Sequence, residues 1–450
     1  MKLVVSPGKA LVGEISLPGD KSISHRAALF ASIAEGESHI QNFLIAGVTR
    51  AMLQALAELG VTWSLQDTTL TIHGLGVLKR EKFSKTVNLF CGNSGTTLRL
   101  LAGAIAAWGI PAILDGSSGL RRRPMKRIVE PLQEMGVPIL ASPGYTAPLQ
   151  IAARPQGQRL RAINYTLPIA SAQVKSCLLL AALAADGPTV LREPGPSRDH
   201  TEIMLHSMGV SIIKDQQPTG DPGGIYYQTR ISPPGSLRLS PLNILIPGDF
   251  SSAAFLIVAA SITPGSEINL KGVGLNPTRT GLIDALQSMG ADIQVRNKRE
   301  SHGEPLGDLL VRYAPLRGTR ISGSLVIRAI DEIPVLAIAA AFARGKTIVT
   351  QAEELRHKES NRIRDLCREL HRLGVEIEET QDGFIINGGQ DLRGGMVTPH
   401  GDHRLAMALA VAGLAARDTI TIDGAEIISE SFPEFNASLR DLGAAMHIEQ

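Results

Sequence analysis

Small apolar residues and short turns follow one another along the whole chain in a pattern that recurs six times. Each copy has a turn rich in Gly, Asp or Ser, a helix-forming run of small apolar residues, a break, and a short β-branched run. The copies begin about 75 residues apart, which predicts repeated α/β units rather than a solenoid. They occupy residues 19–40, 92–114, 170–191, 248–270, 331–349 and 401–422.

A second marker follows each copy, where a helix-like run ends in Leu-Gly or Met-Gly and a strand-like tail begins. Glycine just past a helix supplies the left-handed conformation that caps it. Leu53, Leu56 and Leu59, before the first of these glycines, have the spacing of a buried helical stripe. Each unit is therefore predicted to run strand–helix–strand–helix–strand. The six glycines are Gly60, Gly136, Gly209, Gly290, Gly374 and Gly443.

Six units most simply form two domains of three units each, related by pseudo-symmetry. We place one domain at residues 20–242 and the other at residues 1–19 together with 243–450. Hinge segments then fall near residues 18–20 and 243–249, where two Pro-Gly pairs suit a crossing but also suit ordinary turns. The predicted fold class is α/β (α+β), with two domains.

Composition and charge narrow the range of partners. The chain has 45 basic and 43 acidic residues, and only 4% of its residues are aromatic. A net charge of +2 gives no long-range field to attract nucleic acid or an anionic membrane, and few rings are available to stack bases. The apolar runs are shorter than the roughly 18 residues that span a bilayer. We therefore expect neither a nucleic-acid nor a membrane partner.

The three cysteines and the first residues indicate a compartment. Cys91, Cys177 and Cys367 are far apart, lie in or beside apolar runs, and lack the spacing of a disulfide framework or a zinc site. Cys91 precedes a glycine turn and could be a nucleophile, although a buried residue ending a strand is the simpler interpretation. The first eight residues lack the apolar core of a signal peptide. These features favour a reducing cytoplasm.

Polar chemistry gathers at the first repeat, where a Gly-Asp turn leads into a helix-forming run. Lys21 stands at the mouth of that helix, and Ser22 and Arg26 are four residues apart on one face. Free N–H groups, the positive end of the helix dipole, a lysine, a hydroxyl and an arginine would converge there. Such a point suits a phosphate or a carboxylate. The alternative is a surface helix with solvated charges.

The fifth repeat places acids among bases. Asp331 begins it, and Lys358, Glu359 and Arg362 follow in a charged segment. Two cations beside a carboxylate suit an anionic substrate that must also exchange a proton. The alternative is an exposed helix laced with salt bridges, which charge runs often form.

Three further groups have competing interpretations. The basic run at residues 121–123 is a weak nucleic-acid signal, because no aromatic residue interleaves with it. His200 with Glu202, and Asp402 with His403, could be metal ligands. No ligand set of usual spacing accompanies them, so structural hydrogen bonding is the favoured interpretation.

Taken in order, the motifs of the six repeats resemble those of the 5-enolpyruvylshikimate-3-phosphate synthase family, class II branch. The resemblance covers essentially the whole chain. It rests on Gly19-Asp20-Lys21-Ser22 with Arg26, Gly92-Asn93-Ser94-Gly95-Thr96, Arg123-Pro124-Met125, Ser171-Ala172-Gln173-Val174-Lys175, Arg198-Asp199-His200-Thr201-Glu202, Asn276-Pro277-Thr278-Arg279, Lys358-Glu359-Ser360-Asn361-Arg362 and Asp402-His403-Arg404.

The resemblance implies a two-domain inside-out α/β barrel, with three βαβαββ units per domain, helices inside and sheets outside. It implies transfer of the enolpyruvyl group of phosphoenolpyruvate to the 5-hydroxyl of shikimate 3-phosphate, with release of phosphate. It also implies a cytoplasmic monomer without a metal or an organic cofactor, whose domains close to exclude water.

The family's roles can be carried over residue by residue. Asp331 matches the carboxylate that takes the 5-hydroxyl proton, and Glu359 matches the acid/base at the methylene carbon. The residues that match shikimate 3-phosphate ligands are Lys21, Ser22, Arg26, Ser171, Ala172, Gln173, Arg198 and Lys358. Those that match phosphoenolpyruvate ligands are Lys21, Gly95, Arg123, Gln173, Arg362 and Arg404.

Two departures from the family pattern limit the resemblance. Other members have a lysine before the Phe432-Pro433 pair, where this chain reads Ser429-Glu430-Ser431, so no phosphoenolpyruvate contact is assigned there. Some class II members have alanine where Gly95 stands, which disfavours the herbicide glyphosate. Tolerance of that herbicide therefore does not follow from the class.

Two rival functions remain open from the sequence. The sister family transfers enolpyruvate to a UDP-amino sugar. It typically has Lys-Asn where this chain has Lys21-Ser22, and it often has a catalytic cysteine in a loop that here reads Gly116-Ser117-Ser118-Gly119-Leu120. The other rival is a non-catalytic anion-binding protein on the same scaffold, which gives no reason for Asp331 and Glu359 to accompany the cations.

Overall fold

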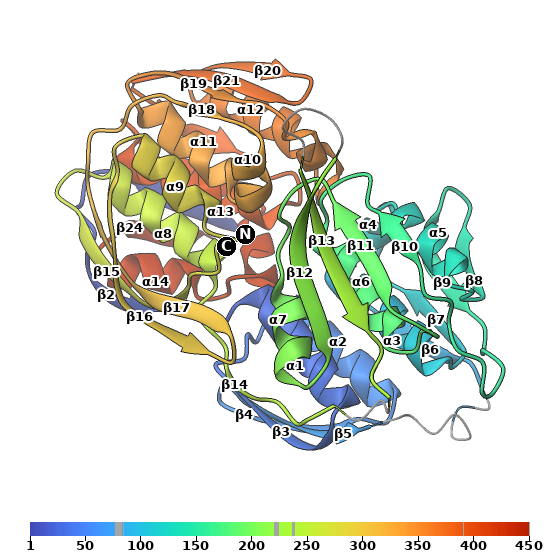
Figure 1. Cartoon of the computed structure of the whole chain (residues 1–450). Coiled ribbons are helices and arrows are strands. Elements are labelled where there is room, and N and C mark those ends of the chain that lie inside the picture. Colours follow the sequence, from blue (N-terminus) through green and yellow to red (C-terminus); the bar gives the residue numbers. More distant parts are fainter. Residues whose placement is uncertain (77–82, 84, 220–224, 236–238, 390, 450) are drawn as a thin grey trace. The chain divides into compact units, whose positions relative to one another are not determined.

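A computed structural model describes residues 1–76, 83, 85–219, 225–235, 239–389 and 391–449 (Figure 1). It is a mixed α/β structure with six sheets of four strands. The chain divides into two compact units. Unit 1 comprises Met1–Asp20, Pro247–Glu300 and Pro305–Gln450, and unit 2 comprises Lys21–Ile246 and Ser301–Glu304. The predicted fold class and the six-fold repeat are confirmed.

Unit 2 holds the first three repeats, each with a helix that opens the repeat, a second helix and a sheet. Its elements are α1 (Lys21–Ile33), β3 (Glu35–Gln41), α2 (Gly47–Glu58), β4 (Thr62–Gln66), β5 (Thr69–Leu75), β6 (Val87–Phe90), α3 (Gly95–Trp108), β7 (Ala112–Asp115), α4 (Ser118–Arg121), α5 (Lys126–Glu134), β8 (Ile139–Ser142), β9 (Thr146–Ile151), β10 (Asn164–Thr166), α6 (Ala172–Ala182), β11 (Thr189–Glu193), α7 (His200–Ser207), β12 (Ser211–Pro218), β13 (Ile225–Ser232) and β14 (Asn243–Leu245).

Unit 1 holds the other three repeats and takes two strands from the start of the chain. Its elements are β1 (Lys2–Ser6), β2 (Val12–Ser16), α8 (Phe250–Ile262), β15 (Glu267–Gly274), α9 (Gly281–Ser288), β16 (Asp292–Ser301), β17 (Glu304–Arg312), β18 (Arg320–Ile321), α10 (Ser324–Ala329), α11 (Ile333–Phe342), β19 (Gly345–Val349), η2 (Glu353–His357), α12 (Arg362–Arg372), β20 (Glu376–Thr380), β21 (Gly383–Gly388), β22 (Gly395–Val397), α13 (His403–Ala415), β23 (Ile420–Asp423), η3 (Ala425–Glu430), α14 (Phe435–Asp441) and β24 (Ala445–Glu449).

All six sheets share one plan, in which a parallel pair of strands is extended on one side by antiparallel pairing. In unit 2, β14 runs parallel to β3, and β5 runs antiparallel to both β3 and β4. In unit 1, β22 runs parallel to β23, and β1 runs antiparallel to both β23 and β24. The repeated strand order shows that each repeat folds as the same βαβαββ module.

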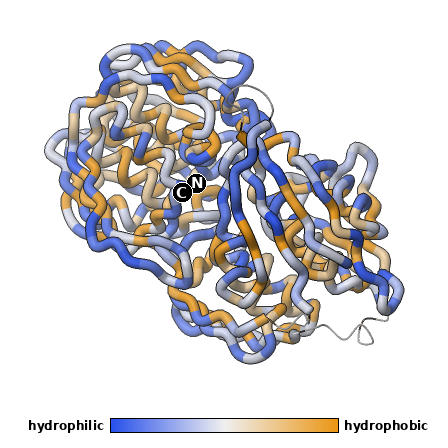
Figure 2. The backbone as a smooth tube through the Cα atoms, in the orientation of Figure 1, coloured by the Kyte–Doolittle hydropathy of each residue, from blue (hydrophilic) through white to orange (hydrophobic). Residues whose placement is uncertain are grey.

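The helices that open the repeats form the core of each unit. All thirteen residues of α8 are buried, and α8, α11 and α13 pack against one another (Figure 1). Figure 2 shows many residues of these helices near the hydrophobic end of the scale. A helix that is apolar on every side must be surrounded by protein, which is why the small-residue runs of the sequence become interior helices.

The second helix of each repeat ends as the sequence predicts. Gly60 follows α2 with φ of 81°, and Gly443 follows α14 with φ of 106°. The same left-handed conformation occurs at Gly136, Gly209, Gly290 and Gly374. A side chain there would be strained, so glycine fixes the point where the chain leaves the helix for the next strand.

The division between the units differs from the predicted one at residue 242. Strand β14 pairs in parallel with β3, with Asn243 opposite His39, so residues 243–246 complete a sheet of unit 2. Ser301–Glu304, between β16 and β17, also group with unit 2. The first feature depends on pairing between segments about 200 residues apart, and the second lies at the tip of a hairpin. Local sequence patterns reveal neither of them.

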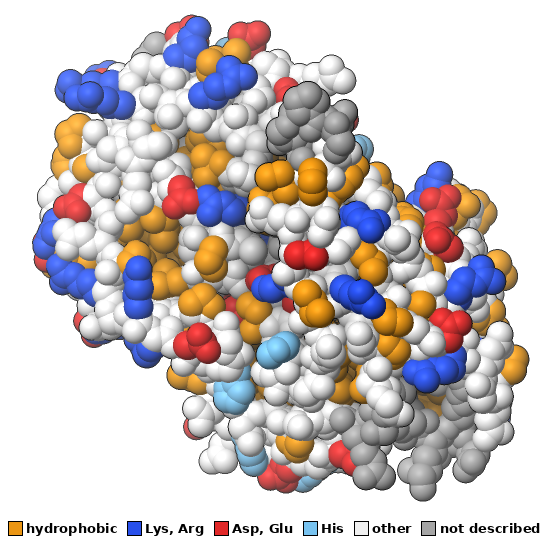
Figure 3. Space-filling view, in the orientation of Figure 1, with side chains coloured by type: hydrophobic (Ala, Val, Ile, Leu, Met, Phe, Trp, Pro, Cys, Tyr) orange, Lys and Arg blue, Asp and Glu red, His pale blue; other side chains and the backbone are white. Residues whose placement is uncertain are grey.

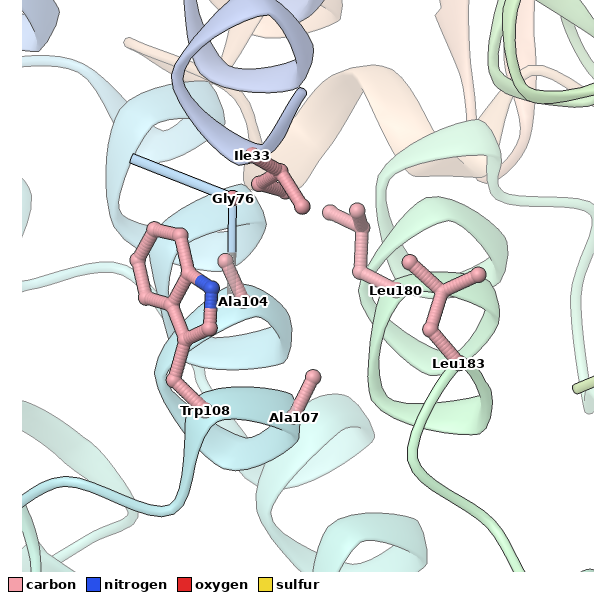
Figure 4. A pocket seen from close by; sticks show the side chains of 7 residues that line it. All are labelled: Ile33, Gly76, Ala104, Ala107, Trp108, Leu180 and Leu183. Atoms are coloured by element: carbon pink, nitrogen blue, oxygen red, sulfur yellow. The ribbon is translucent and has the colours of Figure 1, made fainter. Parts of the chain in front are cut away.

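A small apolar pocket lies where three helices of unit 2 end (Figure 4). Trp108 of α3, Ile33 of α1 and Leu180 of α6 line it. The space left is about 10 Å³, at the lower limit for one water molecule.

The surface agrees with the balanced charge of the sequence. On the face shown in Figure 3, basic and acidic side chains are interspersed over both parts of the chain. Among the described residues, no helix is both long and apolar enough to cross a membrane.

Candidate active site

The start of α1 gathers the first predicted anion ligands of unit 2. Lys21 is the first residue of α1, and Ser22 and Arg26 follow on the buried side. Arg26 donates from Nε to Thr201 Oγ1 at 2.7 Å and from Nη1 to the Ser22 carbonyl oxygen at 3.0 Å. Arg198 Nη1 lies 3.4 Å from Ser22 Oγ. Ser22, Arg26 and Arg198 therefore lie together, as their predicted common role requires.

The start of α3 forms a second group. Ser94 caps the helix by accepting from the Thr97 amide at 3.1 Å. A β-carbon placed on Gly95 would lie 3.0 Å from Arg99 Nη1 and 3.2 Å from Arg123 Nη1. Two guanidinium groups thus lie close above a glycine at a helix N-terminus, an arrangement that suits an anion. Glycine keeps this space open.

Gln173 joins this group through α6. Its side-chain oxygen accepts from Arg99 Nη1, and its nitrogen donates to Thr96 Oγ1 at 2.9 Å. Arg99 also donates to the Pro124 carbonyl oxygen at 3.1 Å, next to Arg123. Sequence reasoning left Arg99 out of the site. Its position four residues after Gly95, on the same face of α3, was the available signal.

The start of α6 is the third group of unit 2. Ser171 is the residue before the helix and Ala172 is its first residue, and both are partly exposed. Lys175, one turn on, is buried instead and pairs with Glu193 at 2.6 Å and Glu202 at 2.8 Å. Burial alone would lower the pKa of Lys175, but the two carboxylates raise it above its usual range. Lys175 therefore anchors α6 as a buried ammonium.

His25 connects the first two groups and makes stability depend on pH. Its Nδ1 lies 2.8 Å from the Lys21 carbonyl oxygen, and its Nε2 lies 3.3 Å from Ser94 Oγ. Burial lowers the pKa of His25 from 6.5 to about 4. Between those values the unfolded chain binds more protons than the folded one, so this contribution is complete above pH 6.5 and is lost as pH falls towards 4.

We expect His25→Gln to flatten that dependence. The wild type should lose about 3 kcal/mol of unfolding free energy between pH 6.5 and 4 through His25 alone. The variant should be less stable at pH 7.5, because the ring contacts are lost, and should lose less on acidification. Urea unfolding across this range measures both slopes, with the exposed His206→Gln as the control. Parallel curves for the wild type and His25→Gln would contradict this account.

In unit 1, Arg362 is the centre of a cluster of carboxylates. It is the first residue of α12, and its side chain is 1% exposed. Its Nε donates to Asp402 Oδ2 at 2.7 Å, its Nη2 to Glu359 Oε2 at 2.6 Å, and its Nη1 to Asp331 Oδ1 at 3.3 Å. Burial alone would lower the pKa of Arg362, but these carboxylates raise it well above its usual range. One guanidinium group thus orients both predicted catalytic acids.

Arg404 lies on the other side of Asp331. It is the second residue of α13 and donates from Nη1 to the Asp331 carbonyl oxygen at 3.1 Å. Its Nη2 is 3.6 Å from Asp331 Oδ2. Asp402 caps α13 by accepting from the Arg404 amide at 2.9 Å, while its two oxygens also contact Arg362. The helix cap therefore fixes the two arginines with respect to each other.

Lys358 and Glu359 lie in a segment that is not helical. They stand between η2 and α12, so the exposed helix considered from the sequence is not formed. Lys358 Nζ lies 3.9 Å from Glu354 Oε1, and the Lys358 side chain is one-quarter exposed. Desolvation lowers the pKa of Lys358, and Asp331 and Glu354 oppose that change. The predicted site residues of unit 1 form one group, which consists of Lys358, Glu359, Arg362, Asp331 and Arg404.

The other candidates have structural roles. His200 Nδ1 lies 2.7 Å from Glu304 Oε1, and both side chains are buried. Cys91 follows β6 and is fully buried, and burial raises the pKa of its thiol to about 12, which argues against a nucleophile. Within the described ranges, no group of three or more His, Cys, Asp or Glu side chains is arranged to hold a metal ion.

Comparisons with known proteins identify the family. The family model described as EPSP synthase (3-phosphoshikimate 1-carboxyvinyltransferase) matches residues 5–439. A 3-phosphoshikimate 1-carboxyvinyltransferase of Herpetosiphon aurantiacus is 48% identical, over 97% of this chain and 98% of that protein. The same enzyme of Synechococcus sp. is 46% identical, over 98% and 96% of the two chains.

A solved structure agrees with these sequence matches. The EPSP synthase of Acinetobacter baumannii superposes with a TM-score of 0.84 at 40% identity, covering 100% of both chains. The match therefore extends over every repeat of the fold and all the residue groups described above. This chain belongs to the EPSP synthase (3-phosphoshikimate 1-carboxyvinyltransferase) family.

Proposed function

We propose that this chain transfers the enolpyruvyl group of phosphoenolpyruvate to the 5-hydroxyl of shikimate 3-phosphate. The products are 5-enolpyruvylshikimate 3-phosphate and inorganic phosphate. Family membership over nearly the whole chain supports this reaction. The acid–base group centred on Arg362 supports it independently, since addition and elimination at a carbon–carbon double bond both require proton transfer.

Unit 2 supplies most of the proposed ligands for the two anionic substrates. Shikimate 3-phosphate is bound by Lys21, Ser22 and Arg26 at the start of α1, by Ser171, Ala172 and Gln173 at the start of α6, and by Arg198. Phosphoenolpyruvate is bound by Lys21, Gly95, Arg123 and Gln173. Helix N-termini and guanidinium groups are the usual ligands of phosphate and carboxylate groups.

Unit 1 supplies the proposed chemistry. Asp331 takes the proton of the 5-hydroxyl as the hydroxyl oxygen attacks C2 of phosphoenolpyruvate. Glu359 gives a proton to C3, and a tetrahedral intermediate forms. Glu359 then removes a proton from the new methyl group as the bond from C2 to the phosphate oxygen breaks. Lys358 contacts shikimate 3-phosphate, and Arg362 and Arg404 bind phosphoenolpyruvate. The proton taken by Asp331 passes to the departing phosphate, and Glu359 ends the reaction protonated as it began, so protons balance and no redox cofactor is needed.

One observation carries this mechanism more than any other. Asp331 and Glu359 both accept hydrogen bonds from the same buried guanidinium group, so the two acid side chains are held close together. A protein that only bound anions would gain nothing from two acids beside Lys358 and Arg404, because like charge repels the ligand. The arrangement therefore favours an enzyme over an anion-binding protein.

Transfer to a UDP-amino sugar is the second candidate. Here Ser22 contacts Arg198, and Ser117 of the cysteine-free loop caps α4 by accepting from the Leu120 amide at 3.3 Å. Ser22 stands where the sister family typically has asparagine, and residues 116–120 contain no cysteine. These two differences in sequence favour shikimate 3-phosphate as the acceptor.

A phosphate-release assay tests the acceptor directly. We expect turnover of phosphoenolpyruvate with shikimate 3-phosphate and none with a UDP-amino sugar at equal concentration. Mass spectrometry of the product should show the acceptor plus one enolpyruvyl group. Turnover with the UDP-amino sugar alone would refute the proposed acceptor, and turnover with neither would refute the proposed reaction.

We further propose that the enzyme works as a monomer in the reducing cytoplasm. The three cysteines, Cys91, Cys177 and Cys367, are all free and buried, which supports a compartment that does not form disulfides.

A further inference from the structure

Arg279 is a buried arginine to which the proposed reaction assigns no role. It is 2% exposed and precedes α9, within the Asn-x-Thr-Arg motif of the sequence. Its Nη1 donates to Asp20 Oδ2 at 3.1 Å, and its Nη2 donates to Ser251 Oγ at 2.8 Å. Asp20 and Ser251 belong to the same unit as Arg279, so this contact set lies within unit 1.

Glu332 is the group that connects Arg279 with the site. It follows Asp331 in the chain, and its side chain is completely buried. Its Oε1 accepts from Ser251 Oγ at 2.5 Å and lies 3.8 Å from Arg279 Nη2 and 3.6 Å from Arg404 Nη1. Its Oε2 has no hydrogen-bond partner among the described residues. Two arginines thus lie near one carboxylate, of which only Oε1 has a hydrogen-bond partner among the described residues.

The two arginines are not equivalent. Arg404 Nη1 hydrogen-bonds the Asp331 carbonyl oxygen at 3.1 Å, and it has no hydrogen bond to Glu332, whose Oε1 lies 3.6 Å away from it and 3.8 Å away from Arg279 Nη2. The Ser251 hydroxyl accepts from Arg279 and donates to Glu332, which links these two charges through one short relay. A buried carboxylate must be compensated by nearby positive charge. Here Arg279 can supply that charge, which leaves Arg404 to its contacts with Asp331.

We propose that Arg279 is a positioning residue that compensates Glu332, so that Arg404 keeps its orientation and its charge for phosphoenolpyruvate. The inference rests on the proposed function, in which Arg404 binds that substrate. It assigns the Asn-x-Thr-Arg motif to the electrostatic balance of the site rather than to substrate contact. Without Arg279, Glu332 would draw Arg404 away from the Asp331 carbonyl group and neutralise it.

The test compares Arg279→Met, Glu332→Gln and the double variant. We expect Arg279→Met to raise KM for phosphoenolpyruvate by about tenfold or more, with a smaller change in KM for shikimate 3-phosphate. Glu332→Gln alone should lower KM for phosphoenolpyruvate by about threefold, since Arg404 loses a competing acid. The double variant should have a KM for phosphoenolpyruvate at least about threefold lower than that of Arg279→Met, because no charged Glu332 is left to compete for Arg404. Both variants lose the contact of Arg279 with Asp20, so that loss cancels in this comparison.

Arg312→Met is the matched control, because Arg312 forms a surface ion pair with Glu267 at 2.6 Å within the same unit. We expect it to leave both KM values unchanged. A double variant no better than Arg279→Met would overturn the inference, and so would a rise in KM for phosphoenolpyruvate on Glu332→Gln. If Arg279→Met does not fold, the sign of the Glu332→Gln effect still decides.

Failure of the proposed function can be told apart from failure of this inference. A wild type without turnover would refute the function. Urea unfolding of the wild type, Arg279→Met, Glu332→Gln and the double variant would then still measure the coupling of Arg279 with Glu332. Additive losses of unfolding free energy would refute the compensation itself.

Discussion

Glu359→Gln is expected to lower kcat by about a hundredfold to ten-thousandfold, the usual contribution of a general acid–base. The amide keeps the size of the side chain and can still accept from Arg362 Nη2, which now contacts Glu359 Oε2 at 2.6 Å. It cannot give a proton to C3 or remove one. KM values for both substrates should therefore change much less than kcat.

Hydrogen exchange at the methylene carbon isolates this step. In deuterium oxide, the wild type should incorporate deuterium at C3 of phosphoenolpyruvate during turnover, and Glu359→Gln should not. Glu353→Gln, in the exposed turn η2, is the control and should behave as the wild type. Unchanged turnover in Glu359→Gln would refute the role given to Glu359.

Arg362→Met is expected to abolish detectable turnover and to destabilise the protein. The substitution leaves the Asp402 side chain, which is completely buried, without its 2.7 Å partner, and it also releases Asp331 and Glu359. Removing one partner of a buried ion pair typically costs about 3–5 kcal/mol of unfolding free energy. Urea unfolding and phosphate release measure the two effects.

Two companion variants separate charge from geometry at Arg362. Arg362→Lys keeps the charge but offers one point of contact in place of a planar fork, so it should recover stability more than turnover. Arg362→Met with Asp402→Asn should recover part of the unfolding free energy, because the most deeply buried acid is now neutral. If Arg362→Met is as stable as the wild type, the carboxylate cluster does not depend on this arginine.

The sequence predicted most of the local structure. The six small-residue runs became the interior helices, and the glycines after the second helices adopt the left-handed conformation. Both signals are local, since a helix apolar on every side and a glycine cap each follow from a few adjacent residues. Lys21 also lies at the start of the first of these helices, as expected.

The sequence could not predict which side chains at the starts of these helices contact one another. The exposed helix considered as the alternative for Lys358 and Arg362 is not formed, because the segment between η2 and α12 is irregular and Arg362 is buried among acids. The links of Arg26 to α7 and of Arg279 to Glu332 also join residues far apart in the chain. Such contacts depend on tertiary packing, which leaves no periodic trace in the sequence.

The placement of the first two strands has a consequence for synthesis on the ribosome. Strand β1 lies between β23 and β24, and β2 pairs with β15, whereas nearly all of unit 2 is one continuous stretch of chain. All of unit 2 except Ser301–Glu304 has been made by residue 246, but β1 must wait for partners made more than 400 residues later. The nascent chain thus carries an unpaired strand through most of translation, which is the period when it is most exposed to aggregation and to chaperones.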